Sequence, residues 1–127
     1  MAVEFLSSEW ADALTSELNA NEVFRQAIVG QHATIQQRIT RDGGDTTYWI
    51  KIADDAIAMG IGDAENADAT ITQSYESAVK LATGELSAVT AFMTGKIKIA
   101  GNMGLLLGLQ GAFSQLPAAM AAIDVSY

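Results

Sequence analysis

The sequence of 127 residues contains no cysteine. This absence excludes disulfides, thiolate metal sites and cysteine nucleophiles, while the redox compartment stays open and a cytoplasmic location is the default expectation. Histidine occurs once, at His32, so a transition-metal site would have to rest on that residue and carboxylates alone. We therefore expect no metal and no cofactor, and we interpret His32 as a partly exposed residue at the junction of a helix and a strand.

Basic residues are also scarce. Seven Lys and Arg stand against fifteen Asp and Glu, which gives a formal net charge of −8. A negatively charged surface repels the phosphate groups of nucleic acids and of anionic membranes, so we expect no nucleic-acid partner. Apolar stretches are too short or too interrupted for a membrane span of about 20 residues, which predicts no stable membrane insertion. The N-terminus has neither the basic segment nor the long apolar core of a secretion signal.

Motifs of the common catalytic classes are missing. No Gly-x-Ser-x-Gly elbow is present, although residue counts alone leave a Ser-His-Asp triad open. Gly95-Lys96 is followed by Ile97 where a phosphate-binding loop needs Ser or Thr. Asp54-Asp55 is explained by a tight turn, in which adjacent side chains point apart. The sequence therefore predicts a protein that is not an enzyme.

Two helices are predicted before the first strand. Ser7 or Ser8 is a suitable N-cap for the first helix, and Asn21 begins the second, which ends at Gly30. Apolar residues recur at helical spacing in both. They are Trp10, Leu14 and Leu18 in the first helix, and Val23, Phe24, Ala27 and Ile28 in the second.

Between Thr34 and Asp63, apolar residues recur at every second position, which predicts three strands. Asp42-Gly-Gly-Asp45 and Asp54-Asp55 supply turn residues between them, so the strands should form an antiparallel meander. The pattern then predicts a strand over 68–72, a helix over 75–82 capped by Ser74, a helix from Ser87 to before Gly95, a strand over 96–100 and a helix from Asn102 to Pro117. This order predicts a single α+β domain over residues 1–127, with helices packed over a five-stranded, mainly antiparallel sheet.

The last predicted helix has two unlike sides. Gly104, Gly108 and Gly111 fall within a narrow arc and would permit close backbone approach. The opposite side is apolar and carries Leu105, Leu106, Leu109, Phe113 and Leu116. Two interpretations are open: the glycines pack on the sheet with the leucines in ordinary core, or one side faces a cavity for an apolar ligand, with Gln110 as a polar anchor. Polar interruptions exclude a membrane-helix dimer motif.

A family resemblance rests on this same region. The string Met93-Thr-Gly-Lys-Ile-Lys-Ile-Ala-Gly-Asn-Met-Gly-Leu105, followed by Leu109-Gln110, resembles the signature of the sterol carrier protein type 2 domain family. The upstream Asp68-Ala-Thr-Ile-Thr strand and Thr83-Gly-Glu-Leu86 are similar to the family's order, so the resemblance covers about Thr34 to Leu116.

The resemblance implies that the sheet and helices enclose an apolar tunnel. By this resemblance, the turn that positions the last helix is formed by Gly95, Lys96, Gly101, Asn102, Met103 and Gly104. It assigns the lining of the ligand cavity to Leu105, Leu106, Leu109, Gln110 and Phe113.

The implied function is that of a non-catalytic intracellular carrier that binds or transfers a fatty acid, an acyl-CoA or a sterol. The sequence does not select a steroid ring over an acyl chain. The alternative is an accessory or dimerisation module, whose partner is a second copy or an enzyme of lipid or isoprenoid metabolism. Members of the family often carry more basic charge than this acidic chain, which weighs against electrostatic docking to anionic membranes.

Overall fold

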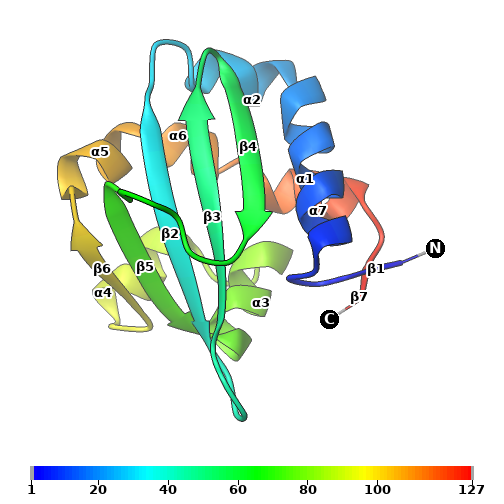
Figure 1. Cartoon of the computed structure of the whole chain (residues 1–127), viewed down its shortest axis with the longest axis vertical. Coiled ribbons are helices and arrows are strands. Elements are labelled where there is room, and N and C mark those ends of the chain that lie inside the picture. The colour runs from blue at the N-terminus through cyan, green and yellow to red at the C-terminus, as the bar shows by residue number, and fades with distance from the viewer. Residues whose placement is uncertain (1, 127) are drawn as a thin grey trace.

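A five-stranded sheet forms the centre of the fold (Figure 1). The computed structural model describes residues 2–126, apart from the side chains of Ala88, Val89 and Gln110. The strands are β2 (Ala33–Thr40), β3 (Thr46–Ala53), β4 (Ala56–Ile61), β5 (Ala69–Ser74) and β6 (Ile97–Gly101). Their order is β4-β3-β2-β5-β6, in which β2 and β5 run parallel and the other neighbours run antiparallel. The predicted α+β class and mainly antiparallel sheet are confirmed.

Helices cover one face of this sheet and one of its edges. They are α1 (Ser8–Ala20), α2 (Glu22–Ala27), α3 (Tyr75–Thr83), α4 (Ala88–Met93), α5 (Met103–Gly108), α6 (Gln110–Phe113) and α7 (Leu116–Ala122). In Figure 1 the helices α3 to α7 lie behind the sheet, while α1 runs beside β4. The sheet therefore has an inner face toward the helices and an outer face toward the viewer.

Five of the described helices, α1 to α5, begin at the residues that the sequence predicts. In each case the side-chain oxygen of the N-cap accepts a hydrogen bond from a backbone N–H in the first helical turn, which satisfies a donor that the helix leaves free. The five caps are Ser7 for α1, Asn21 for α2, Ser74 for α3, Ser87 for α4 and Asn102 for α5.

The hairpin between β3 and β4 turns on Asp54 and Asp55. Both have positive φ, at 54° and 59°, as a two-residue turn between twisted antiparallel strands requires. Gly43 and Gly44 have positive φ in the longer hairpin between β2 and β3. The predicted meander of three strands is confirmed.

The inner face of the sheet is mostly aliphatic because alternate residues of each strand point toward the helices. Its fully or nearly buried residues include Ile35, Ile39, Ile50, Ile52 and Ile57. On the outer face the indole of Trp49 lies over Gly60, so closely that a β-carbon there would overlap the ring. The outer face is thus covered by local side chains and by the segment after β4 rather than by helices (Figure 1).

Helix α1 also covers the edge strand β4. The Asn19 side-chain amide donates to the carbonyl of Ile57 at 3.0 Å, and its oxygen accepts from the N–H of Ile57 at 2.9 Å. An open edge strand presents unpaired backbone groups to other chains. The side chain of Asn19 occupies part of that edge in the manner of a neighbouring strand.

Two features differ from the sequence-based expectation. The segment after Asn102 forms three short helices instead of one, and Pro117 stands in the first turn of α7, where its missing N–H costs nothing. In addition, β1 (Val3–Glu4) pairs in parallel with β7 (Val125–Ser126), a contact between the two ends of the described chain that the sequence did not predict.

Candidate functional site

The residues of the family signature lie at both ends of β6. Gly95 and Lys96 precede the strand, and the run from Gly101 to Gly104 joins it to α5. Gly101 has φ of 103°, a conformation that side chains rarely allow. The next residue, Asn102, donates its backbone N–H to the carbonyl of Asp68 at 3.0 Å and caps α5. The turn therefore fixes where α5 leaves the sheet.

The signature turn is also tied to the middle of the sheet through Asp68. A carboxylate oxygen of Asp68 accepts the N–H of Thr34 at 2.8 Å, and the Asp68 N–H donates to the carbonyl of Thr34 at 2.7 Å. Thr34 belongs to β2. The start of α5 is therefore placed relative to β2 and β5 by backbone hydrogen bonds.

The apolar side of the last helical segment points inward. Leu109 is 0 % exposed, Leu106 is 8 % exposed, and Leu105 and Phe113 are half-buried against the same core. That core also contains Leu18 and Phe24 from the first two helices. Of the five predicted lining residues, the structure brings these four to the buried side, and the side chain of Gln110 lies outside the described residues.

The expectation that the glycine side permits close backbone approach is wrong. Gly104, Gly108 and Gly111 are all exposed. A β-carbon at Gly108 or Gly111 would meet no atom within 4 Å, and one at Gly104 would meet only the side chain of its own cap, Asn102, at 3.5 Å. The helix packs through its leucines, so the glycines are left on the outside.

A polar pair interrupts the aliphatic inner face of the sheet. Gln37 of β2 and Gln73 of β5 are 6 % and 8 % exposed, and the amide nitrogen of Gln73 donates to the amide oxygen of Gln37 at 3.3 Å. Tyr48 of β3 pairs with Gln37 in register, and burial raises the pKa of its hydroxyl. The two-residue period of the strand places Gln37 on the same face as Ile35 and Ile39, but no sequence motif marks Gln37 or Gln73 as a functional residue.

Aromatic residues join the ends of the chain to this sheet. The rings of Phe5 and Tyr48 both meet the indole of Trp10 edge-on, at centroid distances of 5.1 Å and 5.2 Å. The indole N–H of Trp10 donates to the sulfur of Met120 in α7 at 3.2 Å. Such edge-to-face pairs add to the stability that burial provides. The ring contact with Tyr48 holds α1 against the sheet, and the hydrogen bond to Met120 holds α7 against α1.

Two hollows of the described surface lie away from the predicted lining. One, of about 310 Å³, is lined by Ala82, Thr83, Pro117, Met120, Ala121, Ile123, Asp124 and Val125. The other, of about 550 Å³, is lined by Ala2, Glu4, Phe5, Arg41, Tyr75 and Ser126. Leu109, which belongs to the predicted lining, is fully buried in the core. The apolar tunnel therefore stays a prediction.

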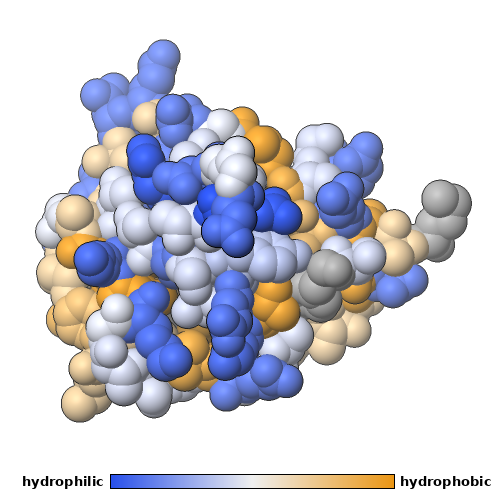
Figure 2. Space-filling view, turned by 90° about the horizontal axis from the view of Figure 1, so that it is seen from below, coloured by the Kyte–Doolittle hydropathy of each residue, from blue (hydrophilic) through white to orange (hydrophobic). Residues whose placement is uncertain are grey.

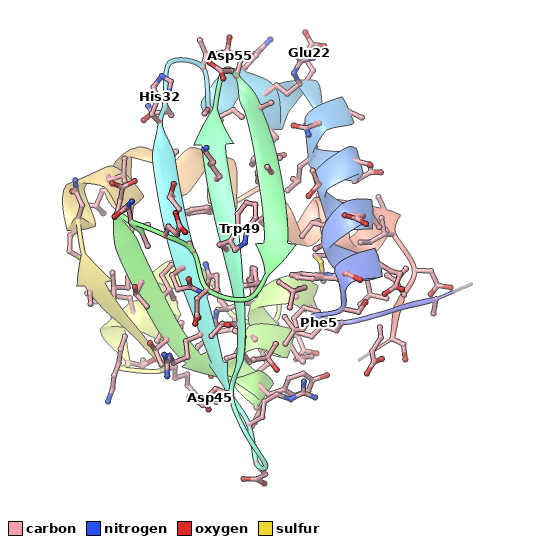
Figure 3. All side chains as sticks on the ribbon, viewed as in Figure 1. Phe5, Glu22, His32, Asp45, Trp49 and Asp55 are labelled. Atoms are coloured by element: carbon pink, nitrogen blue, oxygen red, sulfur yellow. The ribbon has the colours of Figure 1, made fainter. Side chains whose placement is uncertain are left out.

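His32 and the acidic turn lie together at the end of the sheet opposite the long hairpin (Figure 3). His32 is exposed and lies between α2 and β2, at the helix–strand junction that the sequence predicts. The carboxylate of Asp55 accepts the N–H of Gly30 at 3.3 Å, which gives it a structural role. Among the described residues, no three His, Asp or Glu side chains are grouped so that they could hold a metal ion.

A sheet covered on one face by helices, with an aliphatic interior and few polar groups, is the kind of structure that holds an apolar ligand. Residues 4–114 match the SCP-2 sterol transfer family. The chain belongs to this family. Within residues 2–126, no helix combines the length and apolar composition needed to cross a membrane.

Individual relatives agree with this assignment. The chain is 34 % identical over 68 residues to sterol carrier protein 2 of Gallus gallus, which covers 54 % of this chain and 12 % of that protein. It is 41 % identical over 78 residues to peroxisomal multifunctional enzyme A of Dictyostelium discoideum, which covers 59 % of this chain and 17 % of that enzyme. The chain thus spans only a small part of the length of these relatives.

Solved structures show the same fold. A crystal structure of sterol carrier protein 2 superposes with a TM-score of 0.80 at 20 % identity, covering 94 % of this chain and 98 % of that one. The sterol carrier protein domain 2 of Helicoverpa armigera superposes with a TM-score of 0.70 at 25 % identity, covering 87 % of each chain.

Proposed function

We propose that this chain is a non-catalytic lipid-binding domain that holds a fatty acyl, acyl-CoA or sterol-sized ligand between the inner face of the sheet and the helices α5 and α6. The observation that carries the proposal is the leucine side of α5 turned toward the aliphatic inner face in a member of the SCP-2 sterol transfer family. Leu106 and Leu109 would then be displaced by the ligand or contact it directly.

Burial of apolar surface is sufficient to hold such a ligand. A micromolar dissociation constant corresponds to about −8 kcal/mol. At roughly 25 cal/mol per Å² of apolar surface, several hundred Å² of buried ligand supplies this free energy after the costs of association. Because Leu106 and Leu109 are buried in the core, we expect α5 and α6 to move outward on binding. These helices are short, at six and four residues, and both contain exposed glycine, which favours such movement.

The proposal is tested by titrating the purified chain with fluorescent fatty-acid, acyl-CoA and sterol probes. We expect saturable binding of at least one probe at micromolar concentration, and recovery of the unchanged probe after prolonged incubation. Absence of binding to all three probes would overturn the proposal. Conversion of a bound probe to a product would refute its non-catalytic part.

An accessory role is the second candidate, favoured by exposed apolar side chains near the last helices. Phe92 and Met93 of α4 are 44 % and 79 % exposed, and Met103 and Leu107 of α5 are 37 % and 66 % exposed. In Figure 2, seen from the end where the long hairpin lies, apolar residues gather on the side that carries α4 and β6 in Figure 1. Such surfaces frequently mark protein interfaces. Several relatives are longer proteins named as enzymes, of which this chain matches a part.

Native mass spectrometry after gentle purification distinguishes the two roles. A carrier should retain a lipid, whereas an accessory module should show a dimer or a bound enzyme. The cytoplasmic location and the single domain over residues 1–127 stay predictions that belong with the carrier role.

A further inference from the structure

Within the described residues, the amide pair on the inner face contains one fully buried polar atom without a hydrogen-bond partner. The amide oxygen of Gln73, Oε1, is fully buried and accepts no hydrogen bond from any described residue. Gln73 is 8 % exposed, so water reaches little of the side chain. Buried polar atoms in folded proteins nearly always have a partner, and each exception calls for an explanation.

The strand register fixes the environment of this side chain. Gln73 lies between Ile39 of β2 and Ile97 of β6, which are 0 % and 6 % exposed. Its nitrogen Nε2 donates to Gln37 at 3.3 Å, which orients the amide. The amide nitrogen of Gln73 thus has a structural partner in the oxygen of Gln37, whereas its own oxygen Oε1 has none among the described residues. The structure therefore keeps a buried acceptor that the glutamine pair itself does not use.

The strands place no charged side chain on the inner face beside this acceptor. The neighbouring basic residues Arg38 and Lys98 alternate to the outer face, both being in register with Thr72, which adjoins Gln73. Along the described strands the inner face presents aliphatic residues, methionine, threonine, tyrosine, glycine and the two glutamines. A buried carboxylate would have no counter-ion there, and an ionised carboxylate has no hydrogen to donate to Oε1.

We propose that Oε1 of Gln73 accepts a hydrogen bond from a donor group of the bound lipid, so that the domain prefers a neutral lipid with a hydroxyl or amide N–H at its inner end. This inference rests on the proposed lipid-binding function and specifies the ligand class. The aliphatic wall holds the chain or ring system of the ligand, and Gln73 selects its polar group.

A matched pair of ligands tests the role of the donor without any mutation. Hexadecanol and hexadecyl methyl ether share the same chain and oxygen, but the ether has no hydrogen to donate. Each competes with the fluorescent fatty-acid probe for the wild-type chain. We expect hexadecanol to bind about tenfold more tightly, a ratio typical of one buried hydrogen bond. Palmitate at neutral pH should bind more weakly than hexadecanol.

A variant of the glutamine pair assigns the preference to these side chains. Methionine has similar length and no amide, but Gln73→Met also leaves the oxygen of Gln37 without its donor. The double variant Gln37→Met, Gln73→Met removes both acceptors and should bind both ligands with the affinity of the ether. The matched control Thr72→Val changes the adjacent residue, which faces outward, and should keep the tenfold preference. Thermal melts of both variants verify that they are folded.

The outcomes separate this inference from the proposed function. If neither ligand displaces the probe and no probe binds, the lipid-binding function itself fails. Equal affinity of alcohol and ether in a chain that binds lipid would overturn the inference alone, and would indicate a trapped water at Oε1. Tighter binding of the ether, or a preference that persists in the folded double variant, would overturn it as well.

Discussion

Gly101 lies so close to Asp68 that a β-carbon on residue 101 would come within 2.5 Å of the Asp68 carbonyl oxygen and 2.8 Å of the α-carbon of Ala69. Both contacts are with backbone, which cannot rotate away. Residue 101 also has a φ of 103°. Space and conformation therefore both require glycine at the point where β6 turns into α5.

Gly101→Ala should lower the free energy of unfolding by about 3 kcal/mol or more, because the methyl group both strains the backbone and separates β6 from β5. Chemical denaturation of the two proteins measures the difference. An alanine variant as stable as the wild type would show that the turn tolerates a side chain.

Gly108→Ala should instead raise the free energy of unfolding. The position is exposed in α5, has open space around it and lacks a positive φ. Alanine is favoured over glycine in helices, so the variant should gain a few tenths to about 1 kcal/mol. If it instead loses probe binding while remaining stable, the glycine side contacts the ligand or moves against a neighbour during binding.

Leu109→Trp should destabilise the domain by about 1–3 kcal/mol, because residue 109 is fully buried and the indole needs more volume than the core provides. Probe affinity should fall as well, since Leu109 belongs to the predicted lining. Leu107→Trp is the matched control. That residue is 66 % exposed on the same helix, and its replacement should change neither the thermal midpoint nor binding. Normal stability with normal binding in Leu109→Trp would place the ligand elsewhere.

His32→Ala should leave probe binding unchanged and shift stability by less than about 0.5 kcal/mol. The residue is exposed at one end of the sheet, and the described residues place no metal-binding cluster around it. A loss of binding beyond about tenfold in the folded variant would contradict this, and would direct attention to a polar site at that end of the sheet.

The raised pKa of Tyr48 predicts how stability depends on alkaline pH. In the unfolded chain a tyrosine loses its proton near pH 10, while burial holds the proton on Tyr48 in the folded chain. Above about pH 10 the unfolded state therefore binds fewer protons, and this residue lowers the stability by up to about 1.4 kcal/mol per pH unit. Denaturation curves of wild type and Tyr48→Phe should diverge above that pH in favour of the variant. Parallel curves would show that the hydroxyl titrates normally.

Local features of the fold were predictable because short segments determine them. The five N-caps are each settled by one side chain and a backbone N–H three residues later. Asp54-Asp55 adopts the positive φ that a two-residue hairpin demands, whatever packs around it. The leucine side of the last helical segment followed from helical spacing, and the structure turns it inward.

Other features depend on partners that are distant in the sequence. Periodicity predicted a strand that begins at about Thr34 and another over 68–72, but gave no sign that these two strands run parallel and adjacent. The glycines of α5 and α6 define one side of a helix, but only the packed structure shows that this side faces open space.

The sequence by itself determined the family, the α+β class and the positions of the turns and caps, because these follow from neighbouring residues and from one contiguous signature. The tertiary structure alone decided that Gln37 and Gln73, 36 positions apart, share a buried hydrogen bond. It also decided that one oxygen of that pair has no partner among the described residues. Strand pairing and burial set these relationships, and both arise only when distant segments meet.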